Sequence, residues 1–530
     1  MSTTPQRRPP PAPASTSKPA PERRDRLVYY VVVSTTGAAI MMIELLGTRI
    51  IGPFYGVSLI VWSSLISVAL IALSVGYWVG GRLADRAAGL RLSHVVLAAA
   101  AWIGLIPLLS KPVQTAADVL GLRGGAFASA LVLFTFPLTL LAMAGPFVIK
   151  MAAHRLDDVG TTAGRIYAVS TLGSVGGTLA LGFFLLPVAG TRAILLTISV
   201  ALVVLSTFLS AYERRRLGAS HSPVRWALIG LVVLAVVAGL ALAQRGRRYP
   251  GYVSRSEAET YYGWVRVLDQ ESSGIRWLLS DSSTIGAEDR ASGTGLLGYQ
   301  QVVGLLPWFD RRGTEALLVG LGAGHLVGVY ARFGVSTDAV EIDPAVAEAA
   351  ARHFSFRPTG RVLVGDARYH VKKLAKQYDF IVHDCFTGGS EPTHVLSLEA
   401  MTELKARLRP GGVLAVNFVG FTAERDQQPV RSVARTLDQL FRHRRTFVAS
   451  PTAAFNDFVF VVSDRELVLA EDGDGGAAAA WLREREVNVP GDGGTIITDD
   501  FNPLEYQQIA KAEHYRDLLI QRVGRDVLFR

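Results

Sequence analysis

Long apolar runs recur through the first half of the chain, and no other feature restricts its fold as strongly. Each run has about 18 to 25 residues, close to the length that an α-helix needs to cross ~30 Å of hydrocarbon. Only 19% of all residues are charged, against roughly 25% in ordinary soluble domains. The sequence therefore predicts an α-helical transmembrane domain over residues 27–245 with about seven spans: 27–50, 59–81, 93–110, 127–150, 166–187, 192–211 and 225–243.

Basic residues lie in the N-terminal tail and in alternate loops of this region, which predicts that the tail is cytoplasmic. Residues 1–26 are rich in proline, serine and arginine without an apolar period, so we expect a disordered tail rather than a signal peptide. The basic residues that give the net charge of +9 flank apolar spans rather than aromatic side chains that could stack on bases. They therefore do not predict nucleic-acid binding.

Small and ionisable residues stand out within the predicted spans. Glycines four residues apart, Gly76 with Gly80 and Gly173 with Gly177, predict close helix packing. Arg49 and Glu44 lie within or at the edge of the first span, where a charge is costly unless it has a partner or a function. The single cysteine, Cys385, excludes an intramolecular disulfide, and the histidine spacing predicts no metal site.

After residue 250 the pattern changes to short apolar strands that alternate with helical segments, which is typical of a parallel α/β sheet. Two antiparallel strands, residues 263–268 and 276–280, precede this series and predict a small β subdomain. The α/β series extends to about residue 465, and a final element ends near residue 523. Residues 250–530 are thus predicted to form a separate Rossmann-like domain.

A glycine-rich turn marks the first strand of this series. The apolar segment from Glu315 runs into Gly320, Gly322 and Gly324, and a helical stretch follows from His325. Glycines allow the backbone to approach a ligand closely, and the next helix offers its partly positive N-terminus. His325 replaces the third glycine of the dinucleotide pattern, so the turn favours an adenosyl ligand over a dinucleotide.

Acidic residues end the next three predicted strands. Glu341, with Asp343 beside it, lies about 20 residues after the turn, where a carboxylate can accept both ribose hydroxyls. Asp366 ends the third strand and suits an adenine amino group, while Asp384 ends the fourth, where a reacting amine could lie. Because parallel strands direct their carboxyl ends to one edge, we expect these groups to converge there.

The chain resembles the aminopropyltransferase family that makes spermidine, in the bacterial form that carries an N-terminal multi-span domain. The similarity covers residues 259–420 and includes Glu259-Thr-Tyr-Tyr262, Leu279-Ser-Asp281, Tyr299-Gln300-Gln301, the glycine turn, Glu341-Ile-Asp343, Gly365-Asp366 and Tyr378 to Asp384. Thr498 to Glu505 resembles the end of the fused proteins, as do Glu44 to Arg49 and Gly81 to Arg86 in their membrane half.

The resemblance implies roles for individual residues. Glu341 would bind the ribose, Asp366 and the adjacent Ala367 the adenine, and Gln300 the amino-bearing side chain of the nucleoside. Asp384 would be catalytic and would orient or deprotonate the attacking amine, which is nucleophilic only when neutral. Tyr262 and Tyr299 would line the substrate site. The co-substrate would be decarboxylated S-adenosylmethionine or S-adenosylmethionine, with no permanent cofactor, and such modules would form homodimers.

Four positions depart from the family pattern. Gly263 and Ile285 stand in place of glutamines, Ala323 replaces the aspartate of the glycine turn, and Thr387 replaces the second acid of an Asp-x-x-Asp pair. The missing groups are those that would hold the aminopropyl arm and the amine, whereas those for adenosine are present. A dication needs acidic partners, so nucleoside binding is the better supported expectation.

Three hypotheses stay open. The first is a membrane-anchored aminopropyltransferase that acts on a small amine; the second is an S-adenosylmethionine-dependent methyltransferase; the third is a non-catalytic nucleoside- or polyamine-binding module that regulates the membrane domain. All three place the chain in the lipid bilayer of the cell membrane as a multi-pass protein. An odd span number puts the soluble domain outside, whereas the ligand chemistry favours the cytoplasm.

Overall fold

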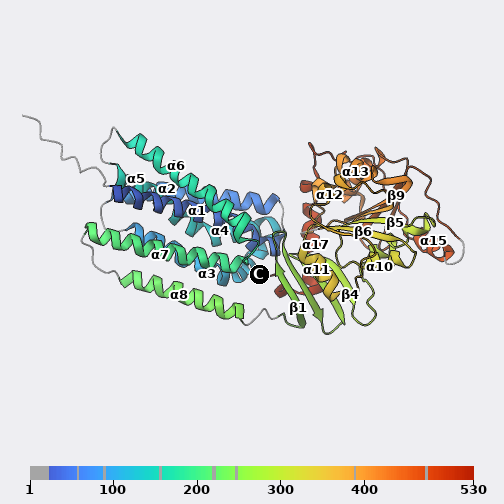
Figure 1. Ribbon diagram of the computed structural model, residues 1–530, viewed down its shortest axis with the longest axis horizontal. Coiled ribbons are helices and arrows are strands. Elements are labelled where there is room, and N and C mark those ends of the chain that lie inside the picture. Colours follow the sequence, from blue (N-terminus) through green and yellow to red (C-terminus); the bar gives the residue numbers. More distant parts are fainter. Residues whose placement is uncertain are drawn as a thin grey trace, which may run out of the picture.

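A computed structural model describes residues 23–56, 59–86, 91–153, 158–217, 223–244, 249–386, 389–471 and 475–529. The molecule is elongated: a bundle of helices forms one end, and an α/β domain forms the other (Figure 1). The chain passes once from the bundle to the α/β domain, after α8. Residues 1–22 of the predicted disordered tail lie outside the described residues.

The bundle contains long helices that run along the length of the molecule (Figure 1). Five helical runs are long and apolar enough to cross a membrane, and one of them, Leu92–Ala152, includes two long helices. The predicted series of long apolar helices is therefore present, while their insertion in a membrane and the number of seven spans stay predictions. The helices are α1 (Arg23–Tyr55), α2 (Leu59–Asp85), α3 (Leu92–Ala117), α4 (Gly121–Ala142), α5 (Ala144–Ala152), α6 (Val159–Leu179), α7 (Thr191–Leu217) and α8 (Pro223–Gln244).

The start of α1 corrects one predicted boundary. The helix begins at Arg23, so the last four residues of the predicted tail are helical. Polar residues such as Arg24 can extend a helix beyond its apolar part, because they lie outside the hydrocarbon and form the same backbone hydrogen bonds. Apolar length therefore predicts where a span lies better than where its helix begins.

The predicted glycine pairs lie at close helix contacts. A Cβ atom at Gly76 would lie 2.5 Å from the carbonyl oxygen of Thr139 in α4. A Cβ at Gly177 would lie 2.8 Å from the Cα of Ala38 in α1. No larger side chain fits at these distances, so the glycines allow α2 to pack on α4 and α6 to pack on α1.

The soluble domain begins with a small antiparallel sheet in the order β1-β2-β3-β4. The two predicted strands correspond to β2 (Trp264–Gln270) and β3 (Ile275–Ser280), which pair antiparallel. Two outer strands complete the sheet, β1 (Tyr252–Glu259) and β4 (Ser283–Asp289). The predicted β subdomain is therefore present with four strands.

The main sheet has seven strands in the order β10-β11-β9-β8-β5-β6-β7. It is mixed rather than purely parallel, because β11 runs antiparallel to both of its neighbours. Its central strands are apolar and buried on both faces, as parallel strands between helix layers must be. The strands are β5 (Glu315–Val319), β6 (Ser336–Glu341), β7 (Val362–Val364), β8 (Tyr378–His383), β9 (Leu408–Phe421), β10 (His443–Val448) and β11 (Phe455–Ser463).

Helices cover both faces of this sheet (Figure 1). One apolar core includes α9, α10 and α15, and the other includes α12, α13 and α14. The helices are α9 (Tyr299–Val303), α10 (His325–Ala331), α11 (Pro344–His353), α12 (Ala367–Lys373), α13 (Leu398–Lys405), α14 (Gln428–Asp438), α15 (Gly475–Arg483), α16 (Leu504–Gln507), α17 (Ile509–Val523) and α18 (Arg525–Leu528).

The C-terminal helices α17 and α18 attach the soluble domain to the bundle (Figure 1). Arg516 of α17 is buried, donates to the carbonyl oxygen of Phe54 at 2.8 Å and forms an ion pair with Asp118. The ring of Phe529 stacks on that of Phe54 with centroids 4.4 Å apart. The two halves therefore share a packed interface in addition to the connecting chain.

Candidate functional site

A cavity of about 590 Å³ opens at the carboxyl edge of the central strands, within the roughly 300–1,000 Å³ of small-molecule sites. It is lined by Gly320 and Gly322 after β5, by Glu341 at the end of β6, and by Asp384 after β8. Asp366 and Ala367 line it after β7. The predicted convergence of these strand ends is therefore present in the structure.

The glycine turn forms the floor of the cavity beside Glu341. Gly320 and Gly322 have φ angles of 98° and 54°, in the left-handed region that favours glycine. The Glu341 carboxylate accepts hydrogen bonds from the backbone N–H groups of Leu321, at 3.1 Å, and Asp343, at 3.0 Å. Burial raises the pKa of Glu341, and these hydrogen bonds oppose that change. These hydrogen bonds hold the Glu341 carboxylate beside the glycine turn.

Asp366 begins α12 and accepts a hydrogen bond from the N–H of Tyr369 at 2.8 Å, as an N-cap does. Its other oxygen lies 3.3 Å from Nε2 of His394, which also lines the cavity. His394 belongs to the segment after β8, in the short 3-10 helix Thr393–Val395. Asp366 therefore links this segment to the cavity wall.

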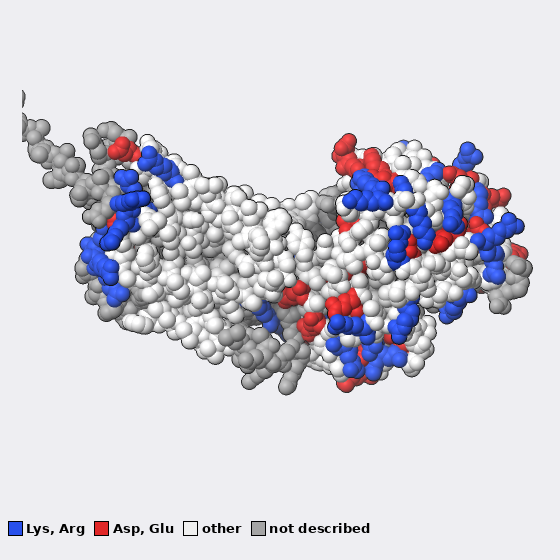
Figure 2. All heavy atoms as spheres, in the orientation of Figure 1, with Lys and Arg blue, Asp and Glu red and all other residues white. Residues whose placement is uncertain are grey.

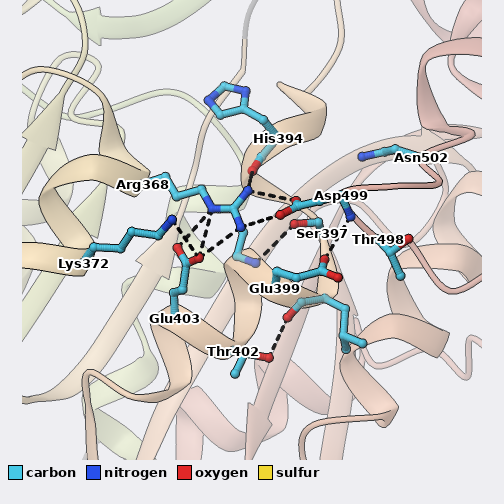
Figure 3. Close-up of polar contacts among 12 residues, drawn as sticks. Arg368, Lys372, His394, Ser397, Glu399, Thr402, Glu403, Thr498, Asp499 and Asn502 are labelled. Atoms are coloured by element: carbon cyan, nitrogen blue, oxygen red, sulfur yellow. Dashed lines mark hydrogen bonds and ion pairs between the residues drawn. The ribbon is translucent and has the colours of Figure 1, made fainter.

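The C-terminal motif, Thr498 to Glu505, contacts the same segment (Figure 3). The Arg368 guanidinium forms ion pairs with Glu403 at 3.0 Å and with Asp499 at 2.6 Å, and it donates to the carbonyl oxygen of His394 at 3.3 Å. The hydrogen bonds from Arg368 lower the pKa of Asp499 to about 2. Asn502 donates to the carbonyl oxygen of Thr393 at 2.8 Å. The C-terminal motif is thus linked to the segment of His394 in the cavity wall, although it lies more than one hundred residues further along the chain.

Asp384 has two side-chain partners in the cavity. The Tyr299 hydroxyl donates to its Oδ2 at 2.5 Å, and the Asn417 amide donates to its Oδ1 at 3.1 Å. Burial raises the pKa of Asp384 to about 6, and the two donors partly oppose this rise. A carboxylate that gains its proton near pH 6 suits a general base at neutral pH. The oriented side chain can therefore accept a proton from a bound ammonium group.

A second carboxylate, Asp457 of β11, lines the same cavity. Burial, and next the negative charge of Asp384, raise its pKa to about 6, while a hydrogen bond from Asn417 lowers it. Two ionised carboxylates that share an amide donor repel each other unless a proton or a cation lies between them. The pair therefore forms a site for a cationic group.

The surroundings of this pair keep its negative charge. Lys511 of α17 lies nearby, but it is buried in an ion pair with Glu391. The residues that line the cavity carry five carboxylates and one guanidinium, that of Arg522. The cavity therefore favours cations and disfavours ligands with carboxylates.

Sequence reasoning missed Asp457 and Asn417, because both lie in strands outside the glycine turn and its neighbouring motifs. Each is a polar residue in a strand of mostly apolar, buried residues, and this contrast is a signal that could have identified them. In the antiparallel register of β9 and β11, Asp457 pairs with Val419, two residues beyond Asn417, so their side chains share one face.

Of the other predicted residues, Tyr262, Asp343 and Tyr299 line the cavity, whereas Gln300 and Gly324 do not. Gln300 donates a hydrogen bond from its amide Nε2 to the Tyr299 hydroxyl oxygen at 3.4 Å. Gly324 precedes α10 in the left-handed region. These two residues lie outside the cavity lining, and their predicted roles in ligand binding stay predictions.

The departures from the family pattern have local explanations. Ala323 is buried among apolar residues and touches Gly286, where a carboxylate would lose its hydration. A Cβ at Gly263 would lie 3.0 Å from the Asp281 carboxylate, so a longer side chain would crowd it. Ile285 lines the cavity and makes that part of the wall apolar. Thr387 lies outside the described residues.

Known proteins share parts of this sequence, although no protein-family model matches it. A polyamine aminopropyltransferase of Vibrio vulnificus is 37% identical over 123 residues, which are 22% of this chain and 40% of that protein. A probable polyamine aminopropyl transferase of Bifidobacterium longum is 24% identical over 308 residues, 50% of this chain and 68% of that protein. The N-terminal histidine N-methyltransferase of Emericella nidulans is 33% identical over 191 residues, 32% of this chain and 34% of that protein.

The alignments cover less than half of the Vibrio and Emericella proteins. Among solved structures, a probable spermidine synthase from Corynebacterium glutamicum has 15% identity and a TM-score of 0.40, with coverage of 48% of this chain and 97% of that one. The polyamine aminopropyltransferases among the sequence relatives agree with the resemblance seen in the motifs. The chain is therefore similar in sequence to parts of polyamine aminopropyltransferases.

Proposed function

We propose that this protein is a membrane-anchored aminopropyltransferase, which moves an aminopropyl group from decarboxylated S-adenosylmethionine to an amine such as putrescine. The observation that carries the proposal is the acidic pair of Asp384 and Asp457 in a cavity whose floor is a glycine turn. Two carboxylates attract a cationic acceptor such as an amine in its ammonium form. The protein would lie in the cell membrane with its tail in the cytoplasm, and its soluble modules would form a homodimer.

The charge of the cavity supports the decarboxylated donor. Five lining carboxylates would repel the α-carboxylate of S-adenosylmethionine, and the decarboxylated form lacks that group. The same carboxylates would attract the positive sulfonium and ammonium groups of the decarboxylated donor. Glu341 would accept from the ribose hydroxyls, and Asp366 from the adenine amino group.

In the proposed reaction the ammonium group of the acceptor first loses a proton to Asp384, and the neutral nitrogen attacks the aminopropyl carbon next to sulfur. The new C–N bond forms as the C–S bond breaks. The bonding electrons move to sulfur, so the sulfonium becomes the neutral thioether of methylthioadenosine. Tyr299 and Asn417 donate hydrogen bonds to the Asp384 carboxylate and so orient it for this proton transfer.

The test uses the full chain purified in detergent, with decarboxylated S-adenosylmethionine and putrescine as substrates. The wild-type protein should release methylthioadenosine, and Asp384→Asn should reduce kcat by about 10²- to 10⁴-fold, as loss of a general base does. Asp492→Asn is the matched control, because Asp492 is exposed and lies outside the cavity lining. Unchanged turnover in Asp384→Asn would exclude the assigned role.

A methyltransferase is the second candidate, because the Emericella relative carries that activity in its name. The same assay separates the two. Methyl transfer from S-adenosylmethionine to an amine or imidazole acceptor, without aminopropyl transfer, would replace the first proposal by the second. Binding of both donors without turnover over a panel of amines would contradict both and favour the non-catalytic module.

A further inference from the structure

The loop of residues 259–263, which comprises the last residue of β1 and the connection to β2, lies between the bundle and the cavity and contacts both. On the membrane side, the Glu259 carboxylate accepts a hydrogen bond at 2.7 Å from the N–H of Thr191, the first residue of α7. A carboxylate at a helix N-terminus is favourable, because it meets unpaired N–H groups and the positive end of the helix dipole. The bundle therefore holds the first residue of the loop.

Arg49 holds the next two residues from α1. Its Nη1 donates to the carbonyl oxygen of Thr260 at 2.7 Å, and its Nη2 donates to the carbonyl oxygen of Tyr261. Its guanidinium also lies 5.6 Å from the ring centroid of Tyr261. The planar guanidinium can bind two adjacent carbonyls at once, which a lysine ammonium does less well. The cationic residue noted in the first predicted span thus binds backbone of the soluble domain.

The cavity side of the loop continues these contacts. The Thr260 hydroxyl donates to Oδ2 of Asp343 at 2.6 Å, and the Asp343 Oδ1 accepts from the N–H of Ala345 at 2.9 Å, at the start of α11. The same hydroxyl oxygen lies 3.1 Å from the N–H of Tyr262. Tyr262 and Asp343 both line the cavity, beside Glu341. One threonine therefore connects the guanidinium of a membrane helix to two residues of the cavity wall.

We propose that Arg49 of helix α1 is a positioning residue of the nucleoside pocket, which makes the membrane bundle part of the ligand site. It fixes residues 260 and 261, and Thr260 in turn orients Asp343 and Tyr262 toward the bound nucleoside. The proposal rests on nucleoside binding, the first part of the proposed function, but not on the transfer reaction. Because coupling is reciprocal, a bound nucleoside also stabilises the contact between α1 and the loop.

The test measures binding of 5′-methylthioadenosine to the full chain in detergent by calorimetry. Arg49→Gln removes the charge and the paired hydrogen bonds, and the dissociation constant should rise about tenfold, within the range of coupling energies between sites. Lys111→Gln is the matched control, because Lys111 also joins the bundle to the soluble domain, through Asp526 at 2.5 Å, but does not touch the loop. The control should bind the probe as the wild type does.

Variants at Thr260 separate positioning from folding. Thr260→Val should weaken probe binding, Thr260→Ser should restore it, and adding Arg49→Gln to Thr260→Val should cost little more, because both changes interrupt the same chain of contacts. Thermal midpoints of all variants show whether the fold is kept. Wild-type affinity in a folded Arg49→Gln protein, or equal losses in Arg49→Gln and Lys111→Gln, would overturn the proposal. Probe binding by a wild-type protein without transferase activity would contradict the proposed function and leave this inference intact.

Discussion

Replacement of Asp457 by asparagine should weaken the acceptor site and stabilise the fold. Asparagine keeps the size of the side chain and removes its charge from beside Asp384. If Asp457 binds the acceptor ammonium, the lost charge-assisted hydrogen bond is worth about 1.5–3 kcal/mol. That energy corresponds to a KM for the amine that is about 10- to 100-fold higher, at tenfold per 1.4 kcal/mol. The KM for the nucleoside donor should change little.

The same substitution has an effect on stability whose sign follows from the raised pKa. The pKa of Asp457 rises from 3.8 to about 6 on folding, so the folded state binds the proton more tightly and loses stability as the pH increases from about 4 to about 6. Above pH 6 the cost is complete, about 3 kcal/mol from two pKa units at 1.36 kcal/mol each, and the repulsion between the two carboxylates is part of it. Asp457→Asn should therefore unfold at a higher temperature than the wild type at pH 8, and the difference should disappear near pH 4.

The assays are steady-state kinetics with varied putrescine and thermal unfolding of the ligand-free full chain in detergent at pH 4 to 8. Asp492→Asn again serves as the control, since it removes one exposed carboxylate from the same domain. An unchanged KM for putrescine would refute the placement of Asp457 in the acceptor site. A variant less stable than the wild type at pH 8 would refute the electrostatic reasoning, because burial and repulsion would then not govern its pKa.

Two further predictions concern the base and the topology. The Tyr299 hydroxyl lowers the pKa of Asp384 by donating to its charged form, so Tyr299→Phe should shift the acidic limb of the pH–rate profile above pH 6; a profile that stays in place would contradict this donor role. Basic residues gather at the end of the bundle that lies away from the soluble domain (Figure 2). The last turns of α2, α5 and α7 are basic and include Arg82, Lys150 and Arg214. The positive-inside rule therefore predicts that a C-terminal reporter is active outside the cytoplasm, whereas the proposed donor predicts activity inside. Activity outside would contradict the proposed aminopropyl transfer, and activity only inside would show that this rule or the span number fails here.

Much of the fold followed from the sequence because its signals are local. Apolar runs of membrane length coincide with helices of the bundle, and the strand ends at Glu341 and Asp384 meet at one edge because parallel strands share a direction. The paired glycines identified close helix contacts, although the pattern could not say that Gly76 faces α4 and Gly177 faces α1. Such pairings depend on the tertiary arrangement, which periodicity alone does not encode.

The parts that could not be predicted are contacts between segments far apart in the chain. Asp457 faces Asp384 only because β11 inserts antiparallel beside β9, and Arg49 contacts Thr260 only because α1 ends where the soluble domain begins. The motifs of the sequence suggested an acceptor site that lacks two expected acids, because Ala323 and Thr387 stand at their positions. The structure instead provides a carboxylate from another strand. If Asp384 and Asp457 bind the acceptor as proposed, an acidic site persists although a motif acid is lost, because its charge depends on position in the cavity and not on position in the sequence.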